Sequence, residues 1–185
     1  MRAKSHHALG QYLTDRYLKQ IPGFHARAFL LGCVQPDRNP LTYLKGSMRY
    51  QWFRGHNYPH TRRFIRRLSR RLENKQYWSV LDYYAMGKLI HYTADAFTYA
   101  HNADFDQSLS FHRKYEDALQ KQFFDHLSRN PTVDLPIAGS VMETIGSFHR
   151  KYRNEPVTIH RDCRYTLQSC CCVLSQLISR KISER

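Results

Sequence analysis

The chain has 185 residues, a hydrophobic fraction of 42% and an aromatic fraction of 14%, a composition that excludes a disordered basic tail. Its 29 Lys and Arg residues against 15 Asp and Glu give a formal net charge of +14. This charge indicates an anionic partner: nucleic acid, an anionic membrane surface or a phosphorylated substrate. No apolar run is long enough to span a bilayer, and the N-terminal segment MRAKSHHALGQYL lacks the apolar core of a signal peptide. We therefore expect a cytoplasmic protein with at most peripheral membrane contact.

Apolar residues recur at helical spacing through most of the chain, and no useful stretch alternates as a strand would. The first helix is expected over 5–20, and a second apolar segment around Phe29 is expected to end at Pro36, where a loop over 36–60 begins. Further helices are expected over 61–76, 77–100, 108–128, 138–153 and 158–182. These elements predict an all-α, multi-helix bundle that forms a single domain over residues 1–185.

The segment TRRFIRRLSRRLENK is predicted to form an amphipathic helix. Its arginines repeat with a four-residue step and therefore stack along one face, while Phe64, Ile65, Leu68 and Leu72 lie on the opposite face. The arginines are Arg62, Arg63, Arg66, Arg67, Arg70 and Arg71. One interpretation is a solvated face over a core-packed stripe. The other is an anion-binding surface for lipid headgroups or a phosphate backbone.

The five cysteines do not form the pattern of a disulfide framework. Cys170, Cys171 and Cys172 are adjacent, the total is odd, and no CxxC pair of the kind found in zinc ribbons is present. We expect the three adjacent cysteines to lie in a helix, with some of the thiols buried. S-acylation and thiol metal binding are the alternatives.

Histidines and carboxylates are concentrated in the segment 87–117. His91 and Asp95 form one i,i+4 pair and His112 and Glu116 form another, with His101 between them. Residues at this spacing lie one turn apart on the same helix face, so each pair can hold one ion. Two antiparallel helices would bring the pairs face to face. Imidazole and carboxylate are the ligands that zinc accepts in hydrolytic sites.

This order of residues resembles the zinc-dependent phospholipase C family, which shares its all-α fold and trinuclear zinc cluster with zinc-dependent single-strand nucleases. The family motif is HxxxD, then a His, then HxxxE, and the residues that match it are His91, Asp95, His101, His112 and Glu116. The resemblance covers roughly residues 5–120.

Upstream positions complete the resemblance. The family has an Asp and a His in a loop before the long helix, which match Asp37 in GCVQPD and His56 in RGHNYPH, with His60 as a competitor for His56. A His in the first helix matches His6, preferred over His7 because His6 follows Ser in the arrangement SHHALGQYL.

The resemblance implies about two to three bound zinc ions. The first would be held by Asp37, His56, His91 and Asp95, the second by His101, His112 and Glu116, and the third by His6 and a bridging Asp95. Asp37 is also implied as the general base. Secreted members complete the third site with an N-terminal Trp. Here the alternatives are the Met1 amine or a water.

The leading hypothesis is a metal-dependent phosphodiester hydrolase that cleaves phospholipid to diacylglycerol and a phosphorylated headgroup through a zinc-activated water. A zinc-dependent nuclease of the same fold is the first alternative, favoured by the arginine-rich helix. A non-enzymatic basic helical module that binds anionic membrane or RNA is the second.

Overall fold

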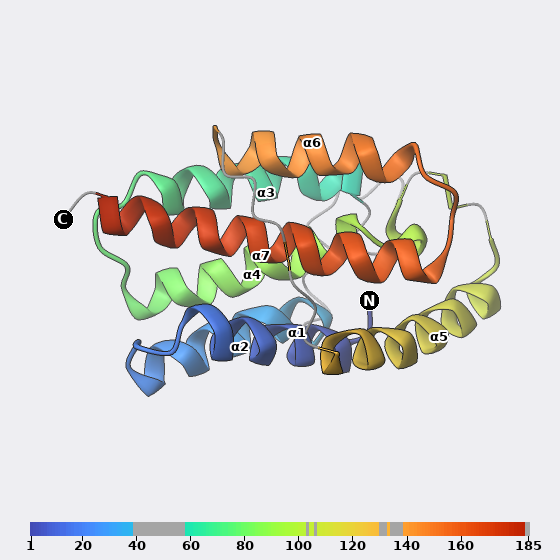
Figure 1. The fold of residues 1–185 in the computed structure, drawn as a ribbon, viewed down its shortest axis with the longest axis horizontal. Coiled ribbons are helices and arrows are strands. Elements are labelled where there is room, and N and C mark those ends of the chain that lie inside the picture. Colours follow the sequence, from blue (N-terminus) through green and yellow to red (C-terminus); the bar gives the residue numbers. More distant parts are fainter. Residues whose placement is uncertain (39–57, 103, 106, 130–132, 134–138, 184–185) are drawn as a thin grey trace.

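The computed structural model describes residues 1–38, 58–102, 104–105, 107–129, 133 and 139–183 (Figure 1). These residues form α-helices and one short 3₁₀ turn, with no strand among them. The elements are α1 (Ala3–Tyr17), α2 (Gly23–Arg38), α3 (Tyr58–Glu73), α4 (Val80–Ala96), the 3₁₀ turn η2 (Tyr99–His101), α5 (Leu109–Ser128), α6 (Val141–Arg153) and α7 (Ile159–Ser183). The predicted all-α, single-domain fold is confirmed.

Two predicted boundaries differ from the structure. The helix predicted over 77–100 is observed as α4 followed by the separate turn η2, and the capping box of Ser79 and Asp82 sets the start of α4 at Val80. The helix predicted to end at Pro36 continues to Arg38. A proline in the last turn removes only one backbone donor, so the helix continues past it. Asp37 therefore lies on α2, and its predicted placement in a loop was wrong.

Helix α4 lies at the centre of the bundle, with α1, α2, α3 and α7 packed around it. Figure 1 shows α3 and α6 along one side of the molecule and α1 and α2 along the other. Nearly every residue from Ala85 to Ala96 is buried. A helix that is buried on all sides requires apolar residues all round, so its polar residues must find partners within the protein.

Helices α2 and α4 approach each other so closely that only glycine fits at the contact. A Cβ atom on Gly32 would lie 2.2 Å from the Tyr84 carbonyl oxygen, and one on Gly87 would lie 2.1 Å from the Phe29 carbonyl oxygen. The main chains are therefore in direct contact. This contact brings the C-terminal end of α2, which carries Asp37, against the C-terminal half of α4.

The expectations for the cysteines and for the arginine-rich helix agree with the structure. Cys170, Cys171 and Cys172 are free and buried in α7, and burial raises the pKa of Cys171 to about 11. On α3 the apolar residues Ile65 and Leu72 are fully buried, whereas the arginine face is exposed. Within the described parts of the chain, no helix has both the length and the apolar character needed to cross a membrane.

Candidate metal centre

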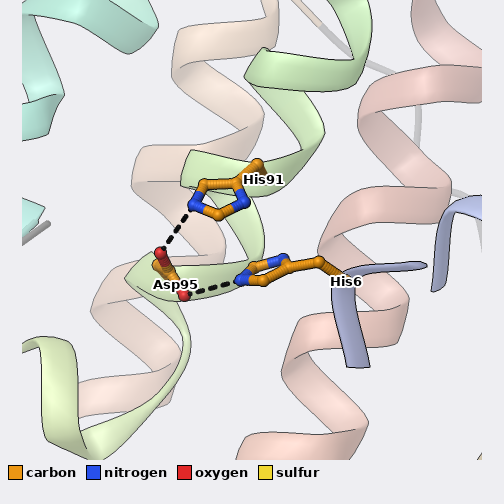
Figure 2. Close-up of side chains that lie close together, drawn as sticks. All are labelled: His6, His91 and Asp95. Atoms are coloured by element: carbon orange, nitrogen blue, oxygen red, sulfur yellow. Dashed lines mark hydrogen bonds and ion pairs between the residues drawn. The ribbon is translucent and has the colours of Figure 1, made fainter. Parts of the chain in front are cut away.

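The first cluster of candidate ligands lies where α1 meets the C-terminal half of α4 (Figure 2). His91 Nε2 lies 3.2 Å from Asp95 Oδ2, one helical turn away on α4. His6 Nε2, from α1, lies 3.2 Å from Asp95 Oδ1. The rings of His6 and His91 stack with centroids 3.8 Å apart. Asp95 therefore faces one imidazole with each of its carboxylate oxygens, and all three residues are buried.

Helix α2 adds Asp37 to this cluster. Its two carboxylate oxygens lie 3.6 Å from His91 Nε2 and 3.9 Å from His6 Nε2, which is too long for hydrogen bonds. Asp37 Oδ2 and Asp95 Oδ2 are buried and have no hydrogen-bond partner among the described residues. Because buried carboxylate oxygens without donors are costly, the arrangement favours a cation between them.

A backbone carbonyl determines which nitrogen of His91 faces the cluster. His91 Nδ1 lies 2.8 Å from the Cys33 carbonyl oxygen, which only accepts hydrogen bonds. Nδ1 therefore carries a proton and donates, and Nε2 faces Asp37 and Asp95. Metal-binding histidines commonly donate their second ring nitrogen to a carbonyl or carboxylate in this way, which orients the ring and fixes its tautomer.

Charge in the first cluster is unevenly distributed. Burial and the neighbouring His91 lower the pKa of His6 to about 4, so the His6 ring is neutral near pH 7. Burial opposes protonation of His91, but Asp95 and Asp37 outweigh it and raise the His91 pKa. Burial would also raise the pKa of Asp95, yet His101 and other positive groups hold it well below its usual range. Ionised carboxylate and neutral imidazole are zinc ligands, and Asp95 and His6 are in these forms near pH 7.

The second cluster joins η2 to α5. Glu116 Oε1 lies 3.4 Å from the Nε2 atoms of both His101 and His112. The Glu116 side chain is 16% exposed and that of His112 is 28% exposed, against 1% for Asp95. Burial would raise the pKa of Glu116, but its contacts with His101 and His112 hold it below its usual range. This cluster is the more accessible of the two.

The Met1 amino group lies between the two clusters. Its nitrogen is 2.6 Å from Asp95 Oδ1, 2.9 Å from His101 Nε2 and 3.4 Å from Glu116 Oε1. Burial lowers the pKa of this amine, but Asp95, Glu116 and Asp37 outweigh it and raise the pKa to about 10. A cation is therefore stabilised at the point where the two clusters meet.

The donor atoms fit a divalent metal. Those of His6, His91 and Asp95 lie within 4.8 Å of one another, as do those of His101, His112 and Glu116. Every donor is an imidazole nitrogen or a carboxylate oxygen, the set that suits zinc. Two groups of this kind, joined through Asp95, form a candidate polynuclear centre.

The structure brings together every predicted ligand whose side chain it describes, from five different elements. His7, the alternative to His6, is exposed on α1 and is not part of either cluster. His56 lies outside the described residues. Its competitor His60 lies on α3, and its side chain is also outside the described part.

Asp162, a buried carboxylate on α7, bonds to the segments that carry the second cluster. It accepts hydrogen bonds from the Tyr99 backbone N–H at 2.6 Å, from the Tyr152 hydroxyl at 2.9 Å and from the Tyr115 hydroxyl. Arg161 Nη2 lies 2.8 Å from Asp162 Oδ1. Tyr99 begins the turn that ends at His101, and Tyr115 immediately precedes Glu116. Asp162 therefore joins both elements that carry the candidate ligands to α7.

Sequence reasoning missed Asp162 and gave no role to the last third of the chain. Asp162 has no ligand spacing, because its partners Tyr99 and Tyr115 come from segments far away in the sequence. The available signal was a carboxylate, next to Arg161, in the first turn of a helix otherwise rich in apolar residues and cysteines. Such a residue must find buried donors.

Comparison of the sequence with known protein families gives evidence for the site that is independent of the structure. The family described as zinc-dependent phospholipase C matches residues 5–170, which extends beyond the roughly 5–120 covered by the resemblance and includes Asp162. Comparisons with curated proteins and with solved structures gave no match. Since the family match covers most of the chain and includes both clusters, the protein belongs to the zinc-dependent phospholipase C family.

Proposed function

We propose that the protein is a zinc-dependent phosphodiester hydrolase that cleaves phospholipid to diacylglycerol and a phosphorylated headgroup. Family membership and the two His and carboxylate clusters support a metal-dependent phosphodiesterase. The observation that carries the proposal is that Asp95 contacts both clusters: it lies 3.2 Å from His6 and from His91, and 3.9 Å from His101. Ions held on either side of one carboxylate would bind a single phosphate group together.

The proposed ligands follow from the family pattern and the contacts. One ion takes Asp37, His56, His91 and Asp95, a second takes His101, His112 and Glu116, and a third takes His6 with Asp95 shared. The Met1 nitrogen, in its neutral form, is the proposed additional ligand where the clusters meet, because it lies within 3.4 Å of Asp95, His101 and Glu116.

Zinc, when bound, lowers the pKa of water and neutralises negative charge on the phosphoryl oxygens. The protein supplies the groups that orient the reactants. Asp37 is the proposed general base, because its side chain is 16% exposed and its Oδ2 has no hydrogen-bond partner among the described residues. It would accept the proton of the attacking water as oxygen bonds to phosphorus. The phosphorus–oxygen bond to glycerol then breaks, and a proton passes to the diacylglycerol oxygen.

The test is a comparison of substrates. A chromogenic phosphorylcholine ester and single-stranded DNA are offered to zinc-loaded protein, with and without chelator. We expect chelator-sensitive cleavage of the ester, faster than cleavage of the DNA. Faster cleavage of DNA would identify a nuclease. No cleavage of either substrate by protein that retains zinc would favour a non-enzymatic binding module.

A further inference from the structure

The arginine face of α3 has almost no counter-charge. Six arginines are exposed on it, and of these only Arg71 pairs with an acidic residue in the described structure, with its guanidinium 2.7 Å from Asp82. The remaining five, which have no acidic partner among the described residues, are Arg62, Arg63, Arg66, Arg67 and Arg70. Like charges one helical turn apart repel each other, so this face is stabilised when an anionic surface covers it.

Helix α6 extends this charge. The ring of Tyr58, at the start of α3, stacks on that of His149 on α6 with centroids 4.0 Å apart. The neighbouring Arg150 is exposed. Burial raises the pKa of Tyr58, and the positive charges of Arg62, Arg150 and Arg66 oppose this increase, so Arg150 adds to the charge of the α3 arginines around Tyr58. The positive surface therefore spans two helices that lie on the same side of the bundle (Figure 1).

Exposed apolar side chains follow the last turn of α3 in the chain. Tyr77 is 74% exposed and Leu81 is 69% exposed. Arg71 and Lys75 both bond to Asp82, at 2.7 and 2.8 Å, so the end of the arginine rows lies at the first turn of α4, which also carries Leu81. Rows of arginine bordered by exposed aromatic and aliphatic side chains are typical of surfaces that lie at a membrane interface.

We infer that α3, Arg150 of α6 and the segment 74–81 form a docking surface for an anionic phospholipid bilayer. The arginines would bind headgroup phosphates while Tyr77 and Leu81 enter the interfacial region. This inference rests on the proposed function for the identity of the anion as a lipid phosphate. A nucleic acid is the less favoured partner, because base stacking needs aromatic rings on the basic face. Phe64, which follows Arg63 on α3, packs edge-on against Tyr92 instead.

Vesicle binding tests the inference. Zinc-loaded protein is sedimented with vesicles of phosphatidylcholine alone or mixed with phosphatidylglycerol, over a range of salt concentrations. We expect binding at least about tenfold tighter to the anionic vesicles, and weaker binding as salt rises. Equal binding to both vesicle types overturns the inference. Tighter binding to single-stranded DNA than to anionic vesicles assigns the surface to nucleic acid instead.

A pair of matched variants locates the surface. Arg66→Glu/Arg67→Glu is expected to weaken binding to anionic vesicles by about tenfold or more. Lys19→Glu/Lys121→Glu changes the net charge equally at exposed positions on other parts of the molecule, and is expected to retain binding within about threefold. An equal loss in both variants would show that binding follows net charge and would overturn the assignment. If the glutamate variant fails to fold, Arg66→Gln/Arg67→Gln serves in its place.

The apolar part of the surface has a separate readout. Tyr77→Ser/Leu81→Ser is expected to lose the vesicle binding that persists at high salt, because insertion of apolar groups is not screened. Hydrolysis of the soluble chromogenic ester by unmodified protein separates this inference from the proposed function. Vesicle binding without hydrolysis would overturn the proposed function alone, and hydrolysis without vesicle binding would overturn the docking surface alone.

Discussion

Asp162 on α7 accepts a hydrogen bond from the backbone N–H of Tyr99 at 2.6 Å, and this bond fixes the turn that presents His101. We expect Asp162→Ala to lower the free energy of unfolding by about 3–5 kcal/mol, because it leaves buried Arg161 without its anionic partner. It is also expected to weaken zinc binding at the second cluster. Urea denaturation and zinc competition with a chromogenic chelator measure the two effects.

The control for this prediction is Asp125→Ala on α5, where the carboxylate is exposed. It is expected to change stability by less than about 0.5 kcal/mol. Asp162→Asn removes the negative charge beside Arg161 but keeps an oxygen that can accept the Tyr99 hydrogen bond. It therefore separates the effect of the charge from the positioning of His101. If Asp162→Ala retained zinc at full affinity, Asp162 would have no part in positioning His101.

Purified zinc-loaded protein is expected to hold about two to three zinc ions per chain, given the number of imidazole and carboxylate donors that converge. Elemental analysis after growth in zinc measures this directly. Fewer than about one ion per chain would contradict a polynuclear centre.

Glu116→Ala and His101→Ala are each expected to remove the ion of the second cluster and to abolish hydrolysis of the chromogenic ester. Each substitution removes one of the three candidate ligands of the second cluster, in which Glu116 Oε1 lies 3.4 Å from the Nε2 atoms of His101 and His112. His7→Ala is the matched control, because His7 is exposed on α1 and lies outside both clusters. Full activity in either of the first two variants would remove these residues from the proposed site.

The contact between α2 and α4 predicts a strong effect of one methyl group. Gly87→Ala would place a Cβ 2.1 Å from the Phe29 carbonyl oxygen, so the two helices must move apart. We expect this variant to lower the free energy of unfolding by about 2–4 kcal/mol. We also expect weaker zinc binding, because Asp37 would move away from His91. Gly146→Ala on α6 meets only an ordinary contact at 3.7 Å and is expected to stabilise by about 0.5–1 kcal/mol. Thermal unfolding of both variants, with and without zinc, measures the difference.

His149 predicts a pH dependence of stability. Burial and then Arg153 lower its pKa from the ordinary histidine value of 6.5 to about 4. The unfolded chain therefore binds a proton that the folded protein does not, and stability falls as the pH decreases from about 6.5 to about 4. The stability difference between wild type and His149→Gln is expected to shrink by about 1–2 kcal/mol between pH 7 and pH 4, after allowance for solvent screening. A difference that stays constant with pH would contradict the buried neutral state.

The helices and most of the candidate ligands could be predicted because their signals are local. Leu and Arg periodicity identified α3, and the i,i+4 spacings identified His91 with Asp95 and His112 with Glu116. The path of the chain at Asp37 was predicted wrongly, because Pro36 is usually a helix terminator, and only the packing of α2 on α4 determines that the helix continues.

Contacts between distant segments could not be predicted in the same way. The hydrogen bond between Asp162 and Tyr99 and the contact between Met1 and Asp95 join residues whose separation is set by the whole bundle. No periodicity in the sequence encodes them. The position of His6 over the ring of His91 is likewise a result of how α1 packs on α4, and the sequence alone left both His6 and His7 as candidates.

Asp95 lies within 3.9 Å of ligand atoms from both clusters, and this has a consequence for how metal is taken up. An ion that binds on one side of this carboxylate would change the negative charge available on the other side. The affinities of the two clusters for metal would therefore be linked, and each ion would change the affinity for the other by the same factor, whichever binds first. If both clusters hold zinc, as proposed, their occupancies would be cooperative, in one sense or the other, and one cluster would not fill or empty without changing the affinity of its neighbour.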